Sequence, residues 1–138
     1  MQVQPYLFFN GRCEEAIEFY RQALAAQVEM LMRFKDSPQP PSPDCAPARG
    51  DKIMHAALRV GDGVVMASDG MADGTPEFKG FSLSLDYPDE AQARRVFDAL
   101  AQGGKVLMPL DKTFFASIFG MVADRFGVQW MVGVMSRP

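Results

Sequence analysis

The order of predicted elements repeats along the chain, and this repetition limits the possible folds more than any other feature. Residues 1–75 read as a strand, a helix and three further strands, and residues 76–138 read as the same order again. The two halves also share a local sequence similarity, because VGDGVVM at 60–66 resembles VADRFGV at 122–128. We therefore predict an α+β fold made of two tandem βαβββ modules within one domain.

In the first module, we expect strands over 3–9, 27–35, 53–60 and 64–69. An amphipathic helix should begin at Arg12, and its apolar residues recur every three or four positions: Cys13, Ala16, Ile17, Tyr20 and Leu24. Five prolines between residues 36 and 50 disfavour helix and sheet, which predicts a surface loop.

In the second module, Phe81, Leu83 and Leu85 alternate with serines, as in a strand with one apolar and one polar face. A helix should follow Pro88, with a buried stripe of Ala93, Val96, Phe97 and Leu100. The remaining strands are expected over 105–110, 117–123 and 128–134. A glycine-rich linker over 70–76 separates the two modules.

Composition excludes several classes of partner. The 138 residues carry 14 Lys and Arg against 17 Asp and Glu, a net charge of −3, which does not suit a nucleic-acid-binding protein. No apolar run approaches the roughly 20 residues of a membrane span, and the N-terminus does not read as a signal peptide. We expect a cytoplasmic protein with no membrane partner. Cys13 and Cys45 form no CxxC motif, so both are expected to be free thiols.

The stretches PYLFFNGRCEEAIEFY (5–20), MHAALRVGDGVVMASD (54–69) and FGMVADRFGVQWMV (119–132) resemble the vicinal-oxygen-chelate superfamily of glyoxalases, bleomycin-resistance proteins and extradiol dioxygenases. They are most similar to its PhnB-like branch. The resemblance implies a curved, mostly antiparallel sheet around a cavity, and a homodimer. Some members of the branch are labelled demethylubiquinone methyltransferases, but no glycine-rich nucleotide loop follows a strand in this chain.

Catalytic members of the superfamily hold a divalent metal on the concave face with His or Glu from the first and last strand of each module. By resemblance, these positions fall at Pro5 and Gly80 in the first strands, and at Met66 or Ala67 and Met131 in the last strands. None of these residues suits a hard or borderline cation. We therefore predict no metal cofactor, with an unusual divalent site that includes His55 and Asp69 as the alternative.

His55 is the only histidine, and the alternation of its strand places it with Arg59 on the face expected to line the cavity. It is either a base, since imidazole titrates near neutral pH, or a structural histidine. A two-residue turn at Gly61-Asp62 would pair His55 with Ser68, whereas a bulge would bring Asp69 opposite and let it orient the imidazole. Asp69 also suits a simple turn.

Further candidate ligand-binding residues come from the second module. Ser82 and Ser84 occupy the polar face of their strand, and the superfamily register places Gln129 and Met131 on the cavity side, leaving Trp130 in the core. Phe114 and Phe115 either close the pocket or fill the core. The leading hypothesis is a homodimer that binds a small apolar or amphipathic molecule without a metal. Its alternatives are a lyase, isomerase or dioxygenase that uses His55, a drug-sequestering resistance protein, and a methyltransferase by family label alone.

Overall fold

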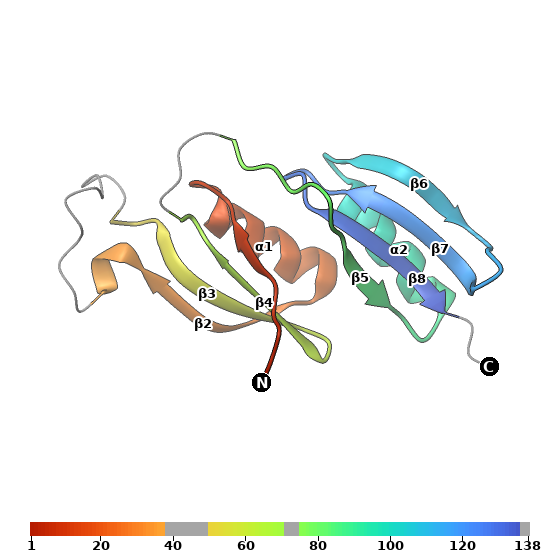
Figure 1. The fold of residues 1–138 in the computed structure, drawn as a ribbon, viewed down its shortest axis with the longest axis horizontal. Helices are drawn as coiled ribbons and strands as arrows, with labels where there is room; N and C mark the ends of the chain where they lie inside the picture. Colours follow the sequence, from red (N-terminus) through yellow and green to blue (C-terminus); the bar gives the residue numbers. More distant parts are fainter. Residues whose placement is uncertain (38–49, 71–74, 136–138) are drawn as a thin grey trace. The chain divides into compact units, whose positions relative to one another are not determined.

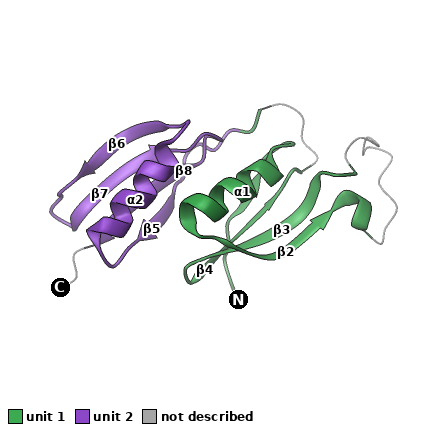
Figure 2. Cartoon of the chain, turned by 180° about the vertical axis from the view of Figure 1, so that it is seen from behind, with its two compact units in different colours: residues 1–76 green, residues 77–138 purple. Residues whose placement is uncertain are grey.

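A computed structural model describes residues 1–37, 50–70 and 75–135. The chain divides into two compact units, Met1–Pro76 and Glu77–Pro138, which Figure 2 shows in green and purple. Most of the predicted proline-rich loop, including Cys45, and most of the predicted linker lie outside the described residues. No helix in the described part of the chain is long and apolar enough to cross a membrane.

Unit 1 is a four-stranded sheet with one α-helix on one face. Its sheet has the order β1-β4-β3-β2, with β1 parallel to β4 and the other neighbours antiparallel. Its elements are β1 (Tyr6–Phe8), α1 (Cys13–Leu24), β2 (Gln27–Arg33), the short 3₁₀ helix η1 (Phe34–Asp36), β3 (Ile53–Val60) and β4 (Gly63–Ser68).

Unit 2 repeats this topology. Its sheet has the order β5-β8-β7-β6, again with the first strand parallel to the last and the others antiparallel. Its elements are β5 (Leu83–Asp86), α2 (Glu90–Ala101), β6 (Lys105–Asp111), β7 (Ala116–Ala123) and β8 (Gln129–Met135). Both units therefore confirm the predicted α+β fold of two βαβββ modules (Figure 1).

The duplication extends to the register of individual residues. In unit 1, Tyr6, Met66, Ala57 and Met30 form one row across the four strands, and in unit 2 the corresponding row is Ser84, Met131, Met121 and Met108. A register shift precedes Met30 in β2, and another precedes Met108 in β6. Two sheets with the same strand order and equivalent irregularities are the structural counterpart of the repeated sequence pattern.

In each unit the α-helix covers one face of the sheet, as seen from behind in Figure 2. The predicted apolar stripes of both helices are buried, which confirms them. The strands that they contact also bury large side chains, among them Leu58, Val122 and Trp130. The opposite face of each sheet carries no α-helix from the described residues. We call it the open face.

β1 is shorter than predicted. Its register with β4 begins at Tyr6, the Pro5 carbonyl still accepts a hydrogen bond from the Met66 N–H at 2.9 Å, and Val3 is exposed. The hairpin of β3 and β4 is confirmed, because Val60 pairs with Gly63 and the register runs without a bulge. Gly61 takes the positive φ of 57° that this two-residue turn requires.

Candidate functional site

The open face of unit 1 carries a tyrosine–histidine pair. The hydroxyl of Tyr6 in β1 lies 3.0 Å from Nδ1 of His55 in β3, and the two ring centroids are 5.5 Å apart. Phe8 extends the group, since its ring centroid is 4.9 Å from that of Tyr6. These side chains come together because β4, which separates β1 from β3, presents small or flexible residues on this face.

The pair fixes the imidazole ring in one orientation. Nδ1 either accepts the tyrosine proton, which leaves a proton on Nε2, or donates its own to the phenol oxygen, which leaves Nε2 free to accept. Of the two ring nitrogens of His55, only Nδ1 has a hydrogen-bond partner among the described residues. His55 is half-buried, so Nε2 is the ring nitrogen on which a ligand can act.

Arg59 and Ser68, both predicted to bind ligand, have partners within unit 1. Arg59 is exposed on β3, and its Nε forms an ion pair with Glu29 of β2. Ser68 is buried, and its hydroxyl accepts a hydrogen bond of 3.1 Å from the Gly70 backbone N–H. Arg59 therefore offers the more accessible polar group, and a ligand role for either residue stays a prediction.

Asp69 lies at the end of β4 and is buried. Its Oδ1 accepts hydrogen bonds from the backbone N–H groups of Gly11 at 2.7 Å and Cys13 at 2.9 Å, at the start of α1. Its Oδ2 accepts one from Ile53 N–H at 2.8 Å, at the start of β3. The carboxylate thus joins three chain segments and serves as the N-cap that Arg12 does not supply. The bulge that would have placed it opposite His55 does not form, so the hairpin does not bring it to the imidazole.

Cys13, at the first turn of α1, is a fully buried free thiol. Burial raises its pKa strongly, and the nearby Asp69 carboxylate raises it further. The thiol therefore stays protonated at physiological pH, and it lacks the thiolate character of a nucleophile or a metal ligand.

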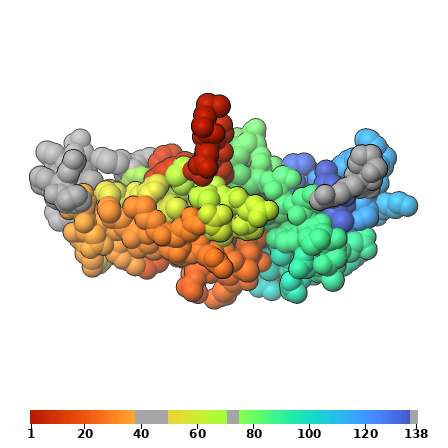
Figure 3. Space-filling model, turned by 90° about the horizontal axis from the view of Figure 1, so that it is seen from below, coloured from red at the N-terminus to blue at the C-terminus, as the bar shows by residue number. Residues whose placement is uncertain are grey.

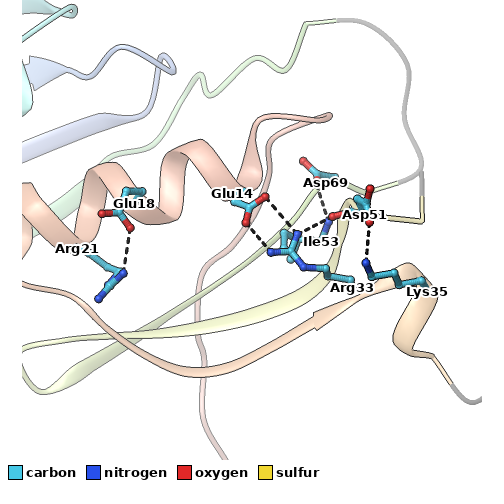
Figure 4. A network of polar contacts seen from close by, with 8 residues as sticks. All are labelled: Glu14, Glu18, Arg21, Arg33, Lys35, Asp51, Ile53 and Asp69. Carbon is cyan, nitrogen blue, oxygen red and sulfur yellow. Dashed lines mark hydrogen bonds and ion pairs between the residues drawn. The ribbon is translucent and has the colours of Figure 1, made fainter. Parts of the chain in front are cut away.

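A surface network of ion pairs ties α1 to β2 and to the start of β3, as Figure 4 shows. Arg33 pairs with Glu14 at 2.5 Å and donates to the Asp51 carbonyl at 2.6 Å, and Lys35 pairs with Asp51 at 2.8 Å. The hydrogen bond from Arg33 lowers the pKa of Glu14, and that from Lys35 lowers the pKa of Asp51. The network is exposed, so it stabilises local structure and offers no enclosed site.

The open face of unit 2 carries the predicted residues of β5 and β8. Ser84 is exposed and pairs with Met131, and Gln129 lies two residues before Met131 on the same face. The Gln129 side-chain amide donates to the Phe78 carbonyl at 3.5 Å. Ser82 is half-buried and precedes β5. Trp130 is buried on the helix side, which confirms its place in the core.

Phe115 is half-buried and belongs to an aromatic cluster on unit 2. Its ring centroid lies 5.1 Å from that of Phe119 and 5.1 Å from that of Phe114, both in T-shaped geometry. Phe114 is 99% exposed, so it does not fill the core. The cluster offers an aromatic surface, and its predicted role in closing a pocket stays a prediction.

The structure shows where the first-strand positions named by the resemblance lie. Tyr6 pairs with Met66 on the open face, and its equivalent in β5 is Ser84, whereas Pro5 and Gly80 precede their strands. In β4 the open-face residue is Met66, because Ala67 is buried. Among residues 1–37, 50–70 and 75–135, no group of three His, Cys, Asp or Glu could hold a metal ion.

Two features were not found from the sequence. Tyr6 lies 49 positions from His55, and no local pattern links them. Asp124 lies between the expected strands over 117–123 and 128–134, and it is buried. Its Oδ1 accepts from the N–H groups of Phe126 and Val128, and its Oδ2 accepts from Trp130 Nε1 at 2.9 Å. The apolar residues around Asp124 were the sequence signal that could have indicated its burial.

Comparison with known proteins places the whole chain in one family. The family model described as 3-demethylubiquinone-9 3-methyltransferase matches residues 1–133. Protein YjdN of Escherichia coli strain K12 is 36% identical over 143 residues, which cover 99% of this chain and 97% of YjdN. The crystal structure of protein PA1353 from Pseudomonas aeruginosa is 48% identical, with a TM-score of 0.86 and 99% of each chain covered.

More distant structures share the fold. The PhnB protein from Bacillus cereus is 25% identical, with a TM-score of 0.79, and the match covers 97% of this chain and 99% of that one. A glyoxylase/bleomycin resistance protein/dioxygenase domain from Frankia sp. EAN1pec is 16% identical, with a TM-score of 0.67 over 99% of this chain and 98% of that domain. This last match shows the fold alone.

Proposed function

We propose a function from the premise that this chain belongs to the 3-demethylubiquinone-9 3-methyltransferase family, the PhnB-like branch of the glyoxalase-like superfamily. The protein binds a small apolar or amphipathic molecule on the open faces of its sheets, without a divalent metal. The observation that carries this proposal is the Tyr6–His55 hydrogen bond on the open face of unit 1.

The chemistry of this face defines the ligand. Tyr6, Phe8 and Met66 offer ring and thioether surface, which suits a ligand with apolar area. The imidazole Nε2 offers one directional polar contact, and Tyr6 holds the ring so that little side-chain entropy is lost on binding. A predominantly apolar surface with one fixed polar group is typical of small-molecule sites. Ser82, Ser84, Phe115, Gln129 and Met131 are proposed as the corresponding contacts in unit 2.

The test is a thermal-shift screen of purified protein against a library of small aromatic and amphipathic compounds, followed by calorimetry. We expect Tyr6→Phe and His55→Ala to weaken binding of the best ligand about tenfold, the usual effect of losing one oriented hydrogen bond. Tyr87→Phe in unit 2 is the matched control and should leave affinity unchanged. Unchanged affinity in both Tyr6→Phe and His55→Ala would contradict the proposal.

The same pair favours a second candidate, an enzyme that uses His55 as its base. In the tautomer with the proton on Nδ1, Nε2 accepts a proton from a ligand while Tyr6 stabilises the imidazolium. Chemical change of the bound ligand that stops in His55→Ala would favour this candidate. Transfer of a methyl group from S-adenosylmethionine would support the activity in the family's description, and retention without chemical change would indicate sequestration.

We also propose that the protein is a homodimer in the cytoplasm. Edge strands β2 and β6 expose apolar side chains, which are costly to leave in water and typical of covered surfaces: Val28, Leu31, Val106 and Leu107. The orange β2 residues are seen at the surface of unit 1 in Figure 3. A second copy of the chain is the proposed cover. Light scattering at micromolar concentration should give twice the mass of the chain, and a monomer would contradict the assignment.

A further inference from the structure

Three methionines lie side by side on the open face of unit 2. Met121 of β7 pairs with Met131 of β8 on one side and with Met108 of β6 on the other. Neighbouring strands are about 4.8 Å apart, and directly opposed residues have Cβ atoms about 5 Å apart. The three thioethers are therefore consecutive members of one row across the sheet.

The row is accessible. Met108 is 45% exposed, and Met121 and Met131 are half-buried, whereas their sequence neighbours Val122 and Val132 are buried on the helix side. A methionine side chain has three rotatable bonds and a polarizable sulfur. The outer two sulfurs can therefore lean towards the central one without moving the backbone.

Thioether donors select one class of metal ion. Sulfur ligands of this soft kind bind Cu(I), while hard cations such as Mg²⁺ and Ca²⁺ require oxygen ligands. The next residue of the row is Ser84, so the row itself brings no carboxylate to the sulfurs. A monovalent soft cation needs no carboxylate to neutralise it.

Unit 1 provides an internal comparison. The equivalent row holds Met30, Ala57 and Met66, so two thioethers flank a methyl group where unit 2 has a third sulfur. Its outer methionines lie two strands apart, roughly 10 Å, with no donor between them. The row of unit 2 thus has three adjacent sulfurs, whereas the equivalent row of unit 1 lacks the central sulfur.

We propose that Met108, Met121 and Met131 form a binding site for one Cu(I) ion on the open face of unit 2. The site shares Met131 with the ligand contacts proposed for unit 2, and it does not involve the Tyr6–His55 pair, which lies on unit 1.

The test uses the full chain labelled with ¹³C at the methionine methyl groups, titrated anaerobically with the tetrakis(acetonitrile) complex of Cu(I). The methyl signals of the three residues, assigned through Leu substitutions, should shift together and reach saturation at one equivalent. Met121→Leu, which keeps volume but removes the central sulfur, should weaken binding at least tenfold. Met30→Leu is the matched control from unit 1 and should leave the titration unchanged.

A second variant tests whether a three-methionine row is sufficient to create a Cu(I) site. Ala57→Met completes the row in unit 1 and should raise the stoichiometry to two ions, with new shifts at Met30 and Met66. Two results would overturn the proposal: shifts of the three methyl groups that are unaffected by Met121→Leu, or no shift of these groups when Cu(I) is bound. Cys45→Ser distinguishes Cu(I) binding at the methionines from binding at the Cys45 thiol, because a methionine site must survive that substitution.

Discussion

Buried carboxylates organise the backbone of each unit. Asp69 and Asp124 follow one pattern, in which Oδ1 accepts from two backbone N–H groups two residues apart and Oδ2 accepts from a third donor. Desolvating a carboxylate is costly, and several charge-assisted hydrogen bonds offset that cost. Such residues are expected to contribute strongly to stability although they contact no ligand.

Replacing either carboxylate by an amide tests this role. Asp69→Asn replaces one of the two acceptor oxygens by an NH₂ group, which then faces a backbone N–H donor. The free energy of unfolding should therefore fall by about 2–3 kcal/mol. Asp124→Asn should have an effect of the same size, measured by urea unfolding. Asp62→Asn, at the exposed β3–β4 turn, is the control and should change stability little. A near-neutral Asp69→Asn would show that the carboxylate charge is unimportant there.

Trp130 completes the Asp124 site and supplies a second prediction at this scale. Trp130→Phe keeps an aromatic ring in the core but removes the Nε1–H that Asp124 Oδ2 accepts. A buried acceptor without its donor should cost about 1–3 kcal/mol, in addition to the smaller ring volume. A double-mutant cycle with Asp124→Asn should show coupling, and additive effects would contradict the assigned hydrogen bond.

At the scale of elements, the two helices begin in different ways. Asp89 caps α2 locally by accepting from Gln92 N–H at 2.8 Å, whereas α1 receives its cap from Asp69, 56 positions away from Cys13. α1 ends at Leu24, and its C-cap residue Ala25 adopts a left-handed φ of 54° that glycine tolerates better. Each helix is therefore well formed at its N-terminus, and α1 carries backbone strain at its C-terminus.

Relieving that strain should stabilise the protein. Ala25→Gly removes the Cβ that disfavours positive φ, and we expect a gain of roughly 0.5–1 kcal/mol in the free energy of unfolding. Gln22→Gly, inside the same helix, should destabilise by about 1 kcal/mol. Thermal unfolding of both variants measures these two changes in stability, which should have opposite signs. Destabilisation by Ala25→Gly would mean that the left-handed cap does not persist in solution.

The ion pair between α1 and β2 should make their contact depend on pH. Arg33 lowers the pKa of Glu14 below its ordinary 4.5, so the pair stabilises the folded state above that pH and loses its effect as the pH falls through the lower, folded-state value. A double-mutant cycle with Glu14→Gln and Arg33→Gln should therefore show coupling at pH 7 that weakens as the solution is acidified. Coupling that stays constant on acidification would contradict the assignment.

At the scale of the whole molecule, the proposed dimer depends on the edge strands. β2 and β6 occupy equivalent edges in the duplicated sheets, and both expose apolar residues. Leu107→Glu should place a charge at this surface and raise the dissociation constant of the proposed dimer at least tenfold, as read by analytical ultracentrifugation. Ala91→Glu, on the exposed side of α2, is the control. An unchanged dissociation constant in Leu107→Glu would place the interface elsewhere.

Much of the architecture could be predicted from local patterns. The stripes of α1 and α2, the alternation in β5 and the two-residue turn at Gly61-Asp62 depend on neighbouring residues and on the fixed periods of helix and strand. Repetition of that order along the chain determined that there would be two modules with one topology. Strand alternation placed His55 on the face away from the helices, and the family resemblance placed Met131 there.

Only the tertiary structure decided which distant groups meet. The partner of His55 is Tyr6 and not Asp69, because β4 inserts between β1 and β3 and the hairpin register is unbroken. The cap of α1 is likewise a residue from the far end of unit 1. Such contacts depend on strand order and register, which arise from packing of the whole sheet, and periodicity along the chain carries no record of them.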